Sequence, residues 1–140
     1  MAHLVTKIAE YGIIFKNNKI LMLRFAKETN SGEKWIFPGG RVDEGEKPVE
    51  GLGREIIEEI GLDVIVRFPC AVTMWGEGED HRYAVFFICD YKDGNVSLSH
   101  EHQDFKWLTE EEIESIEHHN DNFKSVLRDA FSIYKRINVA

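Results

Sequence analysis

The sequence predicts an α/β fold in which a mixed β-sheet carries helices on its faces. Runs of β-branched and aromatic residues, typical of strands, occur before, between and after two helical segments. In the first helical segment, Lys47–Ile60, the residues Leu52, Ile56 and Ile60 recur every fourth position, so one stripe of the helix faces a core. The second segment, Asn122–Ile137, carries apolar residues at helical spacing too. This order of elements indicates a sheet that is covered by helices.

The first two strands form a predicted hairpin. Two apolar runs, Tyr11–Phe15 and Ile20–Phe25, flank the turn signal Asn17-Asn18. A polar loop follows at Lys27–Lys34. The next segment, Pro38-Gly39-Gly40, predicts a sharp turn, because regular elements tolerate this combination of residues poorly.

Further strands are expected in the second half of the chain. Asp63–Trp75 and Arg82–Tyr91 are strand candidates, and the second contains a dense apolar run typical of a buried strand. Asp93-Gly94 predicts another hairpin turn directly after it. Phe105–Leu108 alternates like a short last strand.

Cap signals mark where the helices begin and end. Pro48 suits the first turn of the first helix, and Gly61 suits its C-terminal cap. Thr109, with Glu112 three residues later, resembles a capping box that opens a short additional helix.

Composition and charge indicate which classes of protein this chain can belong to. The chain has 140 residues, 43% of them hydrophobic and 30% charged, which is the balance of one globular domain over residues 1–140. The formal net charge of -8 opposes extended binding to nucleic acid or to an anionic membrane, since both need Lys and Arg to neutralise phosphates. No stretch is apolar enough to span a membrane and no signal layout is present, so we expect a cytoplasmic protein.

Three glutamates share one face of the first helix. Glu55, Glu58 and Glu59 lie three and four positions apart, and the apolar stripe points elsewhere. Like charges at this spacing cost about 0.2 to 0.5 kcal/mol per pair. Anions near a helix C-terminus cost roughly 0.3 to 1 kcal/mol each. Arg54 balances one charge, and a hard cation such as Mg2+, which commonly binds carboxylates together with substrate phosphates, would balance the others.

The surrounding glycines favour a binding site over a merely solvated acidic face. The helix follows the Pro38-Gly39-Gly40 turn and Gly45, where a backbone without side chains lets amide groups approach an anion. At these residues the chain resembles the Nudix box, Gly-x5-Glu-x7-Arg-Glu-U-x-Glu-Glu-x-Gly-U, in which U is a bulky aliphatic residue. Every specified position is matched, by Gly40, Glu46, Arg54, Glu55, Ile56, Glu58, Glu59, Gly61 and Leu62. The segments Trp35–Gly40 and Glu101–Trp107 also look like those of family members.

The resemblance implies a fold, an activity and roles for the box residues. The implied fold is an α/β/α sandwich around a mixed sheet. The implied activity is that of a pyrophosphohydrolase that cleaves a phosphoanhydride bond in a nucleoside diphosphate derivative with Mg2+, or with Mn2+ in its place. The resemblance makes Glu55, Glu58, Glu59 and the Gly40 carbonyl metal ligands, has Arg54 orient a glutamate and Glu46 brace the loop, and gives Gly61 a structural role. Bound cations would neutralise the phosphates and activate a water for attack at phosphorus.

The general base has more than one candidate. In relatives it comes from the box helix, here from Glu55 or Glu58, or from a glutamate on a later loop, where Glu101 stands as a base or metal ligand. Glu77 and Glu79, in the Gly-rich loop 76–80, are alternatives.

Candidate substrate-binding residues are arginines and aromatic residues near the expected strand ends. Arg24, Arg41 and Arg82 have side chains suited to phosphates. Trp35, Phe37 and Trp75 are large enough to stack on a base, although burial is the commoner fate of such rings.

The preferred substrate is a (deoxy)nucleoside triphosphate, ordinary or oxidised, that yields the monophosphate and pyrophosphate. Subgroups for ADP-ribose and dinucleoside polyphosphates tend to carry a Pro or Tyr past the box, and the window Glu77–Asp80 has neither. A sugar nucleotide or a dinucleoside polyphosphate is the alternative. The complete acidic positions count against a non-catalytic nucleotide sensor, and cysteines without acidic or basic partners count against a prenyl diphosphate isomerase. We expect a small-molecule nucleotide as partner and a monomer or homodimer.

Overall fold

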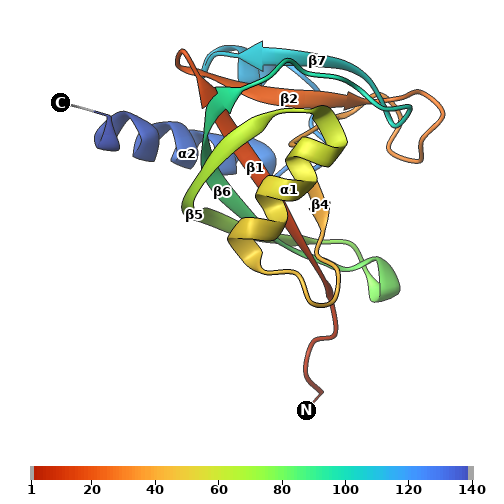
Figure 1. The fold of residues 1–140 in the computed structure, drawn as a ribbon. Helices are drawn as coiled ribbons and strands as arrows, with labels where there is room; N and C mark the ends of the chain where they lie inside the picture. The colour runs from red at the N-terminus through yellow and green to blue at the C-terminus, as the bar shows by residue number, and fades with distance from the viewer. Residues whose placement is uncertain (1, 139–140) are drawn as a thin grey trace.

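The computed structural model describes residues 2–138, and seven strands of this part of the chain form one mixed β-sheet (Figure 1). The strands are β1 Lys7–Lys16, β2 Lys19–Phe25, β3 Trp35–Ile36, β4 Gly39–Arg41, β5 Asp63–Trp75, β6 Arg82–Asp93 and β7 His102–Leu108. The helices are α1 Pro48–Ile60 and α2 Phe123–Ile137, with two short 3-10 helices, η1 Gly78–Asp80 and η2 Glu112–Ser115. Strands run in the order β3-β2-β1-β6-β5, with β4 paired to β1 and β7 paired to β2.

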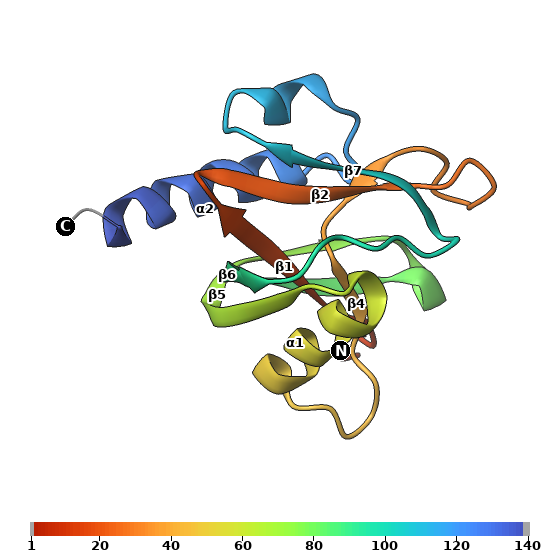
Figure 2. The same cartoon turned by 45° about the horizontal axis from the view of Figure 1, so that its top comes forward.

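The predicted hairpin between β1 and β2 is confirmed. Asn17 and Asn18 have φ values of 51° and 62°, which asparagine tolerates better than most residues. After the pair Phe15 and Ile20 the two strands separate. β1 continues beside β4 and β6, whereas β2 continues beside β3 and β7 (Figure 2). The sheet therefore opens into two halves on one side of the molecule.

The two helices cover opposite faces of β1, because side chains alternate along a strand. A Cβ atom on Gly12 would lie 3.0 Å from Cδ1 of Ile56 in α1. On the other face, the ring of Phe15 stacks on Tyr134 of α2 at a centroid distance of 3.8 Å and meets Phe131 edge-on. The expected α/β/α sandwich around a mixed sheet is therefore confirmed.

Helix α1 begins and ends where the cap signals predict. Pro48 occupies the first helical position, and Gly61 follows the last turn with a φ of 75°. The apolar stripe is buried as predicted. Gly51 and Gly53, in the first half of this helix, are poor helix formers, and the fold supplies a reason for Gly51. A Cβ atom there would lie 3.0 Å from Oε2 of Glu46, so Gly51 makes room for that side chain.

One predicted turn is only partly confirmed and one predicted hairpin is wrong. The chain bends at Pro38. Gly39 and Gly40 belong to strand β4, where they pair with Tyr11 and Glu10 of β1. Gly94 has the positive φ of a turn residue, but β6 is followed by a crossover to β7, which pairs with β2 and not with β6. The turn conformation predicted at Gly94 is therefore present, but the next strand pairs with β2 and not with β6 as a hairpin would require.

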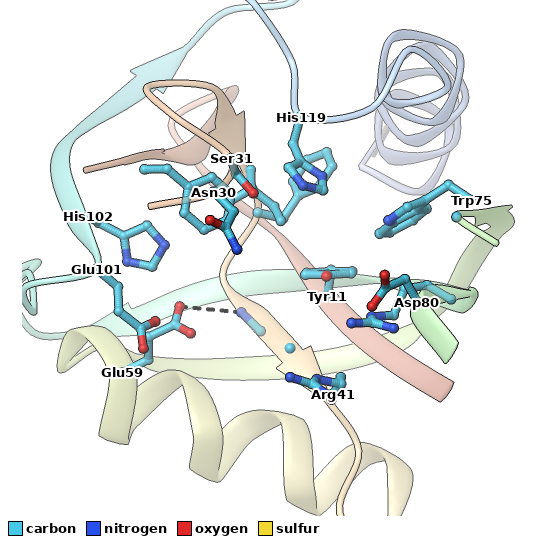
Figure 3. Close-up of a pocket in the computed structure, with 17 residues that line it drawn as sticks. Tyr11, Asn30, Ser31, Arg41, Glu59, Trp75, Asp80, Glu101, His102 and His119 are labelled. Carbon is cyan, nitrogen blue, oxygen red and sulfur yellow. Dashed lines mark hydrogen bonds between the residues drawn. The ribbon is translucent and has the colours of Figure 1, made fainter. Parts of the chain in front are cut away.

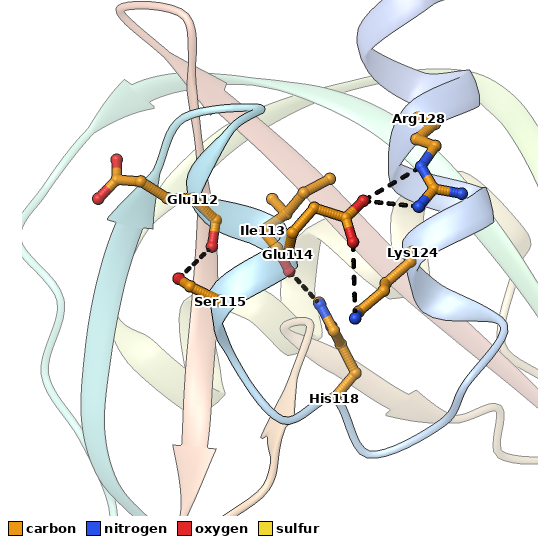
Figure 4. A network of polar contacts seen from close by, with 7 residues as sticks. All are labelled: Glu112, Ile113, Glu114, Ser115, His118, Lys124 and Arg128. Carbon is orange, nitrogen blue, oxygen red and sulfur yellow. Dashed lines mark hydrogen bonds and ion pairs between the residues drawn. The ribbon is translucent and has the colours of Figure 1, made fainter.

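The segment before α2 is held by a polar network (Figure 4). The predicted capping box is present, since the Thr109 amide donates to Oε1 of Glu112 at 3.0 Å and the Glu112 amide donates to Oγ1 of Thr109 at 3.3 Å. It opens η2. The carboxylate of Glu114 in η2 accepts from Nη2 of Arg128 in α2 at 2.6 Å. These contacts join the end of the sheet to the last helix.

No helix among residues 2–138 is both long enough and apolar enough to cross a membrane.

Candidate active site

A cavity of about 590 Å³ lies where the two halves of the sheet separate (Figure 3). Its lining comes from strands, from loops and from helix α1. The lining residues are Tyr11, Phe25, Asn30, Ser31, Ile36, Phe37, Gly39, Gly40, Arg41, Glu59, Trp75, Gly76, Asp80, Arg82, Glu101, His102 and His119. The size suits a small molecule, and the mixture of rings, arginines and carboxylates suits one that has both an aromatic and an anionic part.

The acidic end of the cavity is formed by α1 and by the loop before β7. Glu59, in the last turn of α1, and Glu101 approach each other across this end (Figure 3). The amide of Gly39 donates to Oε1 of Glu59 at 3.4 Å. Because Gly39 and Gly40 present backbone without a side chain, the wall of the cavity here consists of peptide groups.

Arg54 connects the acidic helix to the loop that precedes it. Its Nη2 donates to Oε2 of Glu46 at 2.6 Å, and its Nε lies 3.7 Å from Oε1 of Glu58. The other carboxylate oxygen of Glu46 accepts from the amide of Asp43 at 2.7 Å. Glu46 thereby ties the loop 43–46 together, and Arg54 holds that loop against α1.

The carboxylates crowd one another. Burial, followed by the charges of Glu46 and Asp43, raises the pKa of Glu55 to about 7. Burial also raises the pKa of Glu59 to about 7, against the lowering effect of its hydrogen bond from Gly39. A positive ion placed among these groups would stabilise their charged forms.

A family model described as the NUDIX domain matches residues 7–129. This chain belongs to the NUDIX family. The resemblance drawn from the Nudix box is therefore confirmed, and α1 is the Nudix helix of this protein. Members of the family generally use a divalent metal ion such as Mg2+.

Curated relatives match part of this Nudix domain. An 8-oxo-dGTP diphosphatase from Buchnera aphidicola is 43% identical over 54 residues, which are 39% of this chain and 42% of that protein. The nucleoside triphosphatase NudI from Escherichia coli is 30% identical over 94 residues, which cover 57% of this chain and 64% of that protein. The chain thus matches less than two thirds of the length of either relative.

Solved structures agree over nearly the whole Nudix fold. The MutT protein from Methanosarcina mazei Go1 is 28% identical, covers 96% of both chains and has a TM-score of 0.76. The ORF135 protein from E. coli has a TM-score of 0.77 at 20% identity, with 96% of this chain and 95% of that chain covered.

Some residues of the Nudix box line two adjoining hollows. Gly40, Glu59 and Glu101 line the main cavity, and Glu59 also lines a second hollow of about 330 Å³ together with Glu58 and Ser97–Ser99. Glu55 lines neither hollow. In the part of the chain that the structure describes, no three His, Cys, Asp or Glu side chains gather closely enough to hold a metal ion. The donors nevertheless fit Mg2+ chemically, because carboxylates and a peptide carbonyl are the hard oxygen ligands that this ion prefers.

The substrate-binding candidates divide into two groups. Arg41, Arg82 and Phe37 line the cavity of the Nudix domain, although the Phe37 ring packs against Phe86 and Phe123 in the core. Arg24 and Trp35 lie outside the lining. Trp35 is 5% exposed, and Nε of Arg24 donates to the carbonyl oxygen of Glu33 at 2.9 Å. The fold thus gives neither of these two side chains a surface in the cavity.

The later acidic loop contributes a different residue from those expected. Asp80 lines the cavity, whereas Glu77 does not and Glu79 lines another hollow, beside Val5 and Thr6. Sequence reasoning considered Trp75 at the end of β5, which does line the cavity, but it missed Tyr11, Asn30, His102 and His119. His102 lies in the family-like segment Glu101–Trp107 but was given no role there. Tyr11, Asn30 and His119 belong to no motif, and distant segments bring them together.

Glu10 is the other residue that sequence reasoning missed. It lies in β1 opposite Gly40 and is 5% exposed. Burial, followed by the charges of Glu55 and Glu46, raises its pKa to about 7. A carboxylic acid inside an otherwise apolar strand was the available signal, since such residues are seldom buried without a partner.

We expect Glu10→Gln to stabilise the metal-free protein at pH 8 and much less at pH 5. The pKa of this carboxyl is 4.5 ordinarily and about 7 in the fold, so the folded chain binds the extra proton between these values. Stability therefore falls as pH rises through that window, and glutamine, which does not ionise, avoids this loss. The gain in the free energy of unfolding at pH 8 should be about 1 to 3 kcal/mol.

Urea unfolding in the presence of a chelator measures this gain, with Glu50→Gln in the exposed first turn of α1 as the control. Burial lowers the pKa of His102, His118 and His119, so these groups raise stability as pH rises, with the opposite sign. Comparing the variant with wild type at each pH cancels that contribution. An equal gain at both pH values would contradict the prediction.

Proposed function

We propose that this chain is a Mg2+-dependent pyrophosphohydrolase that cleaves a nucleoside triphosphate to the monophosphate and pyrophosphate. The observation that carries the proposal is that one cavity joins a pair of carboxylates, one of them from the Nudix helix, to aromatic rings on its other side, where Asp80 also lies (Figure 3). Glu59 and Glu101 mark the acidic end, and Trp75 and Tyr11, whose centroids lie 6.2 Å apart, belong to the aromatic end. A nucleotide has the same polarity, with phosphates at one end and a base at the other.

In this proposal, Glu55, Glu58, Glu59, Glu101 and the carbonyl of Gly40 hold the cation. The bound cation supplies charge neutralisation and an activated water. Arg41 and Arg82 bind phosphate oxygens from the cavity wall. Arg54 keeps Glu58 and Glu46 in place, and Glu101 is the candidate base. Two relatives named an 8-oxo-dGTP diphosphatase and a nucleoside triphosphatase support a triphosphate substrate, ordinary or oxidised.

A panel assay with Mg2+ tests the proposal. Deoxynucleoside and nucleoside triphosphates, 8-oxo-dGTP, ADP-ribose, a dinucleoside polyphosphate and a sugar nucleotide are each incubated with the protein, and the products are identified. We expect triphosphates to release pyrophosphate and not phosphate. If only ADP-ribose, the dinucleoside polyphosphate or the sugar nucleotide were hydrolysed, that compound would define the substrate class in place of nucleoside triphosphates. Nucleotide binding without turnover anywhere in the panel would make the chain a sensor.

A further inference from the structure

His119 lies at the aromatic end of the cavity, and its ring is held by three aromatic neighbours. Ring centroids lie 5.5 Å away for Phe25, 6.0 Å for Trp75 and 6.3 Å for Phe123. Trp75 meets the imidazole edge-on. The ring is therefore fixed in orientation by packing, and it faces the cavity that also contains Trp75 and Tyr11 (Figure 3).

The backbone around His119 is equally constrained. Its amide donates to the carbonyl oxygen of Trp35 at 2.8 Å, and the amide of Trp35 donates to the carbonyl oxygen of Glu117 at 2.9 Å. The preceding His118 places Nε2 2.8 Å from the carbonyl oxygen of Ile113 (Figure 4). A buried tryptophan and a polar network thus position this histidine from both sides.

The imidazole of His119 is neutral, and its proton can be assigned to one nitrogen. Burial lowers its pKa, so one ring nitrogen carries a proton and the other does not. Nδ1 is buried and has no hydrogen-bond partner among the described residues. A buried N–H without an acceptor is rarer than a buried acceptor without a donor, so the proton belongs on Nε2. His118 has the same pattern, with Nδ1 unpaired and Nε2 facing a carbonyl oxygen.

The protonated nitrogen of His119 is open to a ligand. Nε2 is not among the buried unpaired atoms, and no described residue accepts from it. A neutral N–H donor can bond to a carbonyl oxygen of the base, and arginines and a metal ion bind phosphates more strongly than a neutral donor does. The opposite tautomer, in which Nε2 would accept a hydrogen bond, is disfavoured because it would leave a buried N–H on Nδ1 without an acceptor.

We propose that His119 determines base specificity by donating Nε2–H to an exocyclic keto oxygen of the substrate's base. The proposal rests on the proposed function. Guanine carries an acceptor oxygen where adenine carries an amino donor, and thymine carries one where cytosine carries an amino donor. A fixed N–H donor facing the amino group of adenine or cytosine would place two donors against each other. A site built to make one hydrogen bond discriminates strongly against a ligand that cannot make it. The preferred substrates are therefore keto-base nucleotides, those of guanine and of thymine or uracil.

Isothermal titration with dGMP and dAMP tests base recognition apart from hydrolysis. Wild-type protein should bind dGMP at least about tenfold more tightly than dAMP. With dGMP the imidazole makes one neutral hydrogen bond, whereas with dAMP two donors face each other. His119→Phe, which keeps a ring in the aromatic cluster, should lose this preference. His119→Gln should accept both ligands, because an amide offers a donor and an acceptor. His100→Gln, at an exposed position near the site, is the control.

Steady-state kinetics with dGTP and dATP supply the second readout. In His119→Phe we expect the KM for dGTP to rise about tenfold while kcat stays near the wild-type value, because the contact is to the base and not to the reacting phosphate. A wild-type protein that binds dAMP as tightly as dGMP, or a Phe variant that keeps the preference, overturns the proposal. If no triphosphate is hydrolysed but dGMP is still preferred, the proposed activity fails and base recognition stands. If dGTP and dATP are hydrolysed equally well, base recognition fails and the activity stands.

Discussion

Glu58→Gln is expected to lower the turnover of nucleoside triphosphates by about 10²- to 10⁴-fold. The side chain of Glu58 is 67% exposed and contacts Arg54 at 3.7 Å, so the amide replaces the carboxylate without disturbing packing. The lost charge is one that holds the cation in the proposed function. Turnover of dGTP and dTTP with Mg2+ measures the effect.

The matched control for this variant is Glu50→Gln, which removes a carboxylate from the exposed first turn of the same helix. Both variants should unfold within a few degrees of the wild-type Tm, since surface substitutions rarely change stability by more than about 0.5 kcal/mol. Wild-type turnover in Glu58→Gln would make this glutamate an ordinary surface acid. Unfolding of the variant would instead make it a structural residue.

Gly39→Ala is expected to destabilise the fold by about 2 to 5 kcal/mol, the sum of backbone strain and steric overlap. Gly39 has a φ of 128°, which residues with side chains rarely adopt. A Cβ atom there would lie 2.2 Å from the carbonyl oxygen of Glu10 and 2.9 Å from Cα of Tyr11. These are backbone atoms of β1, the central strand, and they cannot move aside cheaply. Chemical denaturation measures the change in the free energy of unfolding.

Gly40→Ala is the control, one residue away in the same strand. A Cβ atom on Gly40 would meet nothing within 4 Å, and its φ lies outside the left-handed region. We therefore expect a change of less than about 1 kcal/mol, as for other substitutions that fit their site. Equal destabilisation by both substitutions would show that neither glycine position tolerates a side chain, and would remove Gly39 as the special position.

The pairing of β4 with β1 explains why position 39 is a glycine, which the predicted turn did not explain. Close approach of Gly39 to β1 brings its amide within 3.4 Å of Glu59 and sets Gly40 opposite Glu10. The acidic end of the cavity therefore depends on a backbone contact that no larger residue permits. A sharp turn and a short strand have the same composition here, so the sequence pattern alone did not separate them.

Predictions from local sequence patterns are confirmed where neighbouring residues determine the structure. The stripe of Leu52, Ile56 and Ile60 is buried, and the cap at Gly61 is present, because helical spacing and capping act within a few residues. The turn at Asn17-Asn18 follows the same logic. In contrast, the fate of Gly94 depended on whether the next strand would pair with β6 or β2, and that choice involves residues far away in the chain.

The sequence by itself determined the family and the composition of the acidic helix, since the spacing of the Nudix box places three glutamates on one helix face whatever surrounds them. The tertiary structure decided which side chains share the cavity. It buried Trp35 as a support for His119, left Arg24 outside, and brought Tyr11, Trp75 and His119 together from segments far apart in the chain. The physical reason is that strand separation after Phe15 opens the cavity, and this separation arises from the pairing of the whole sheet.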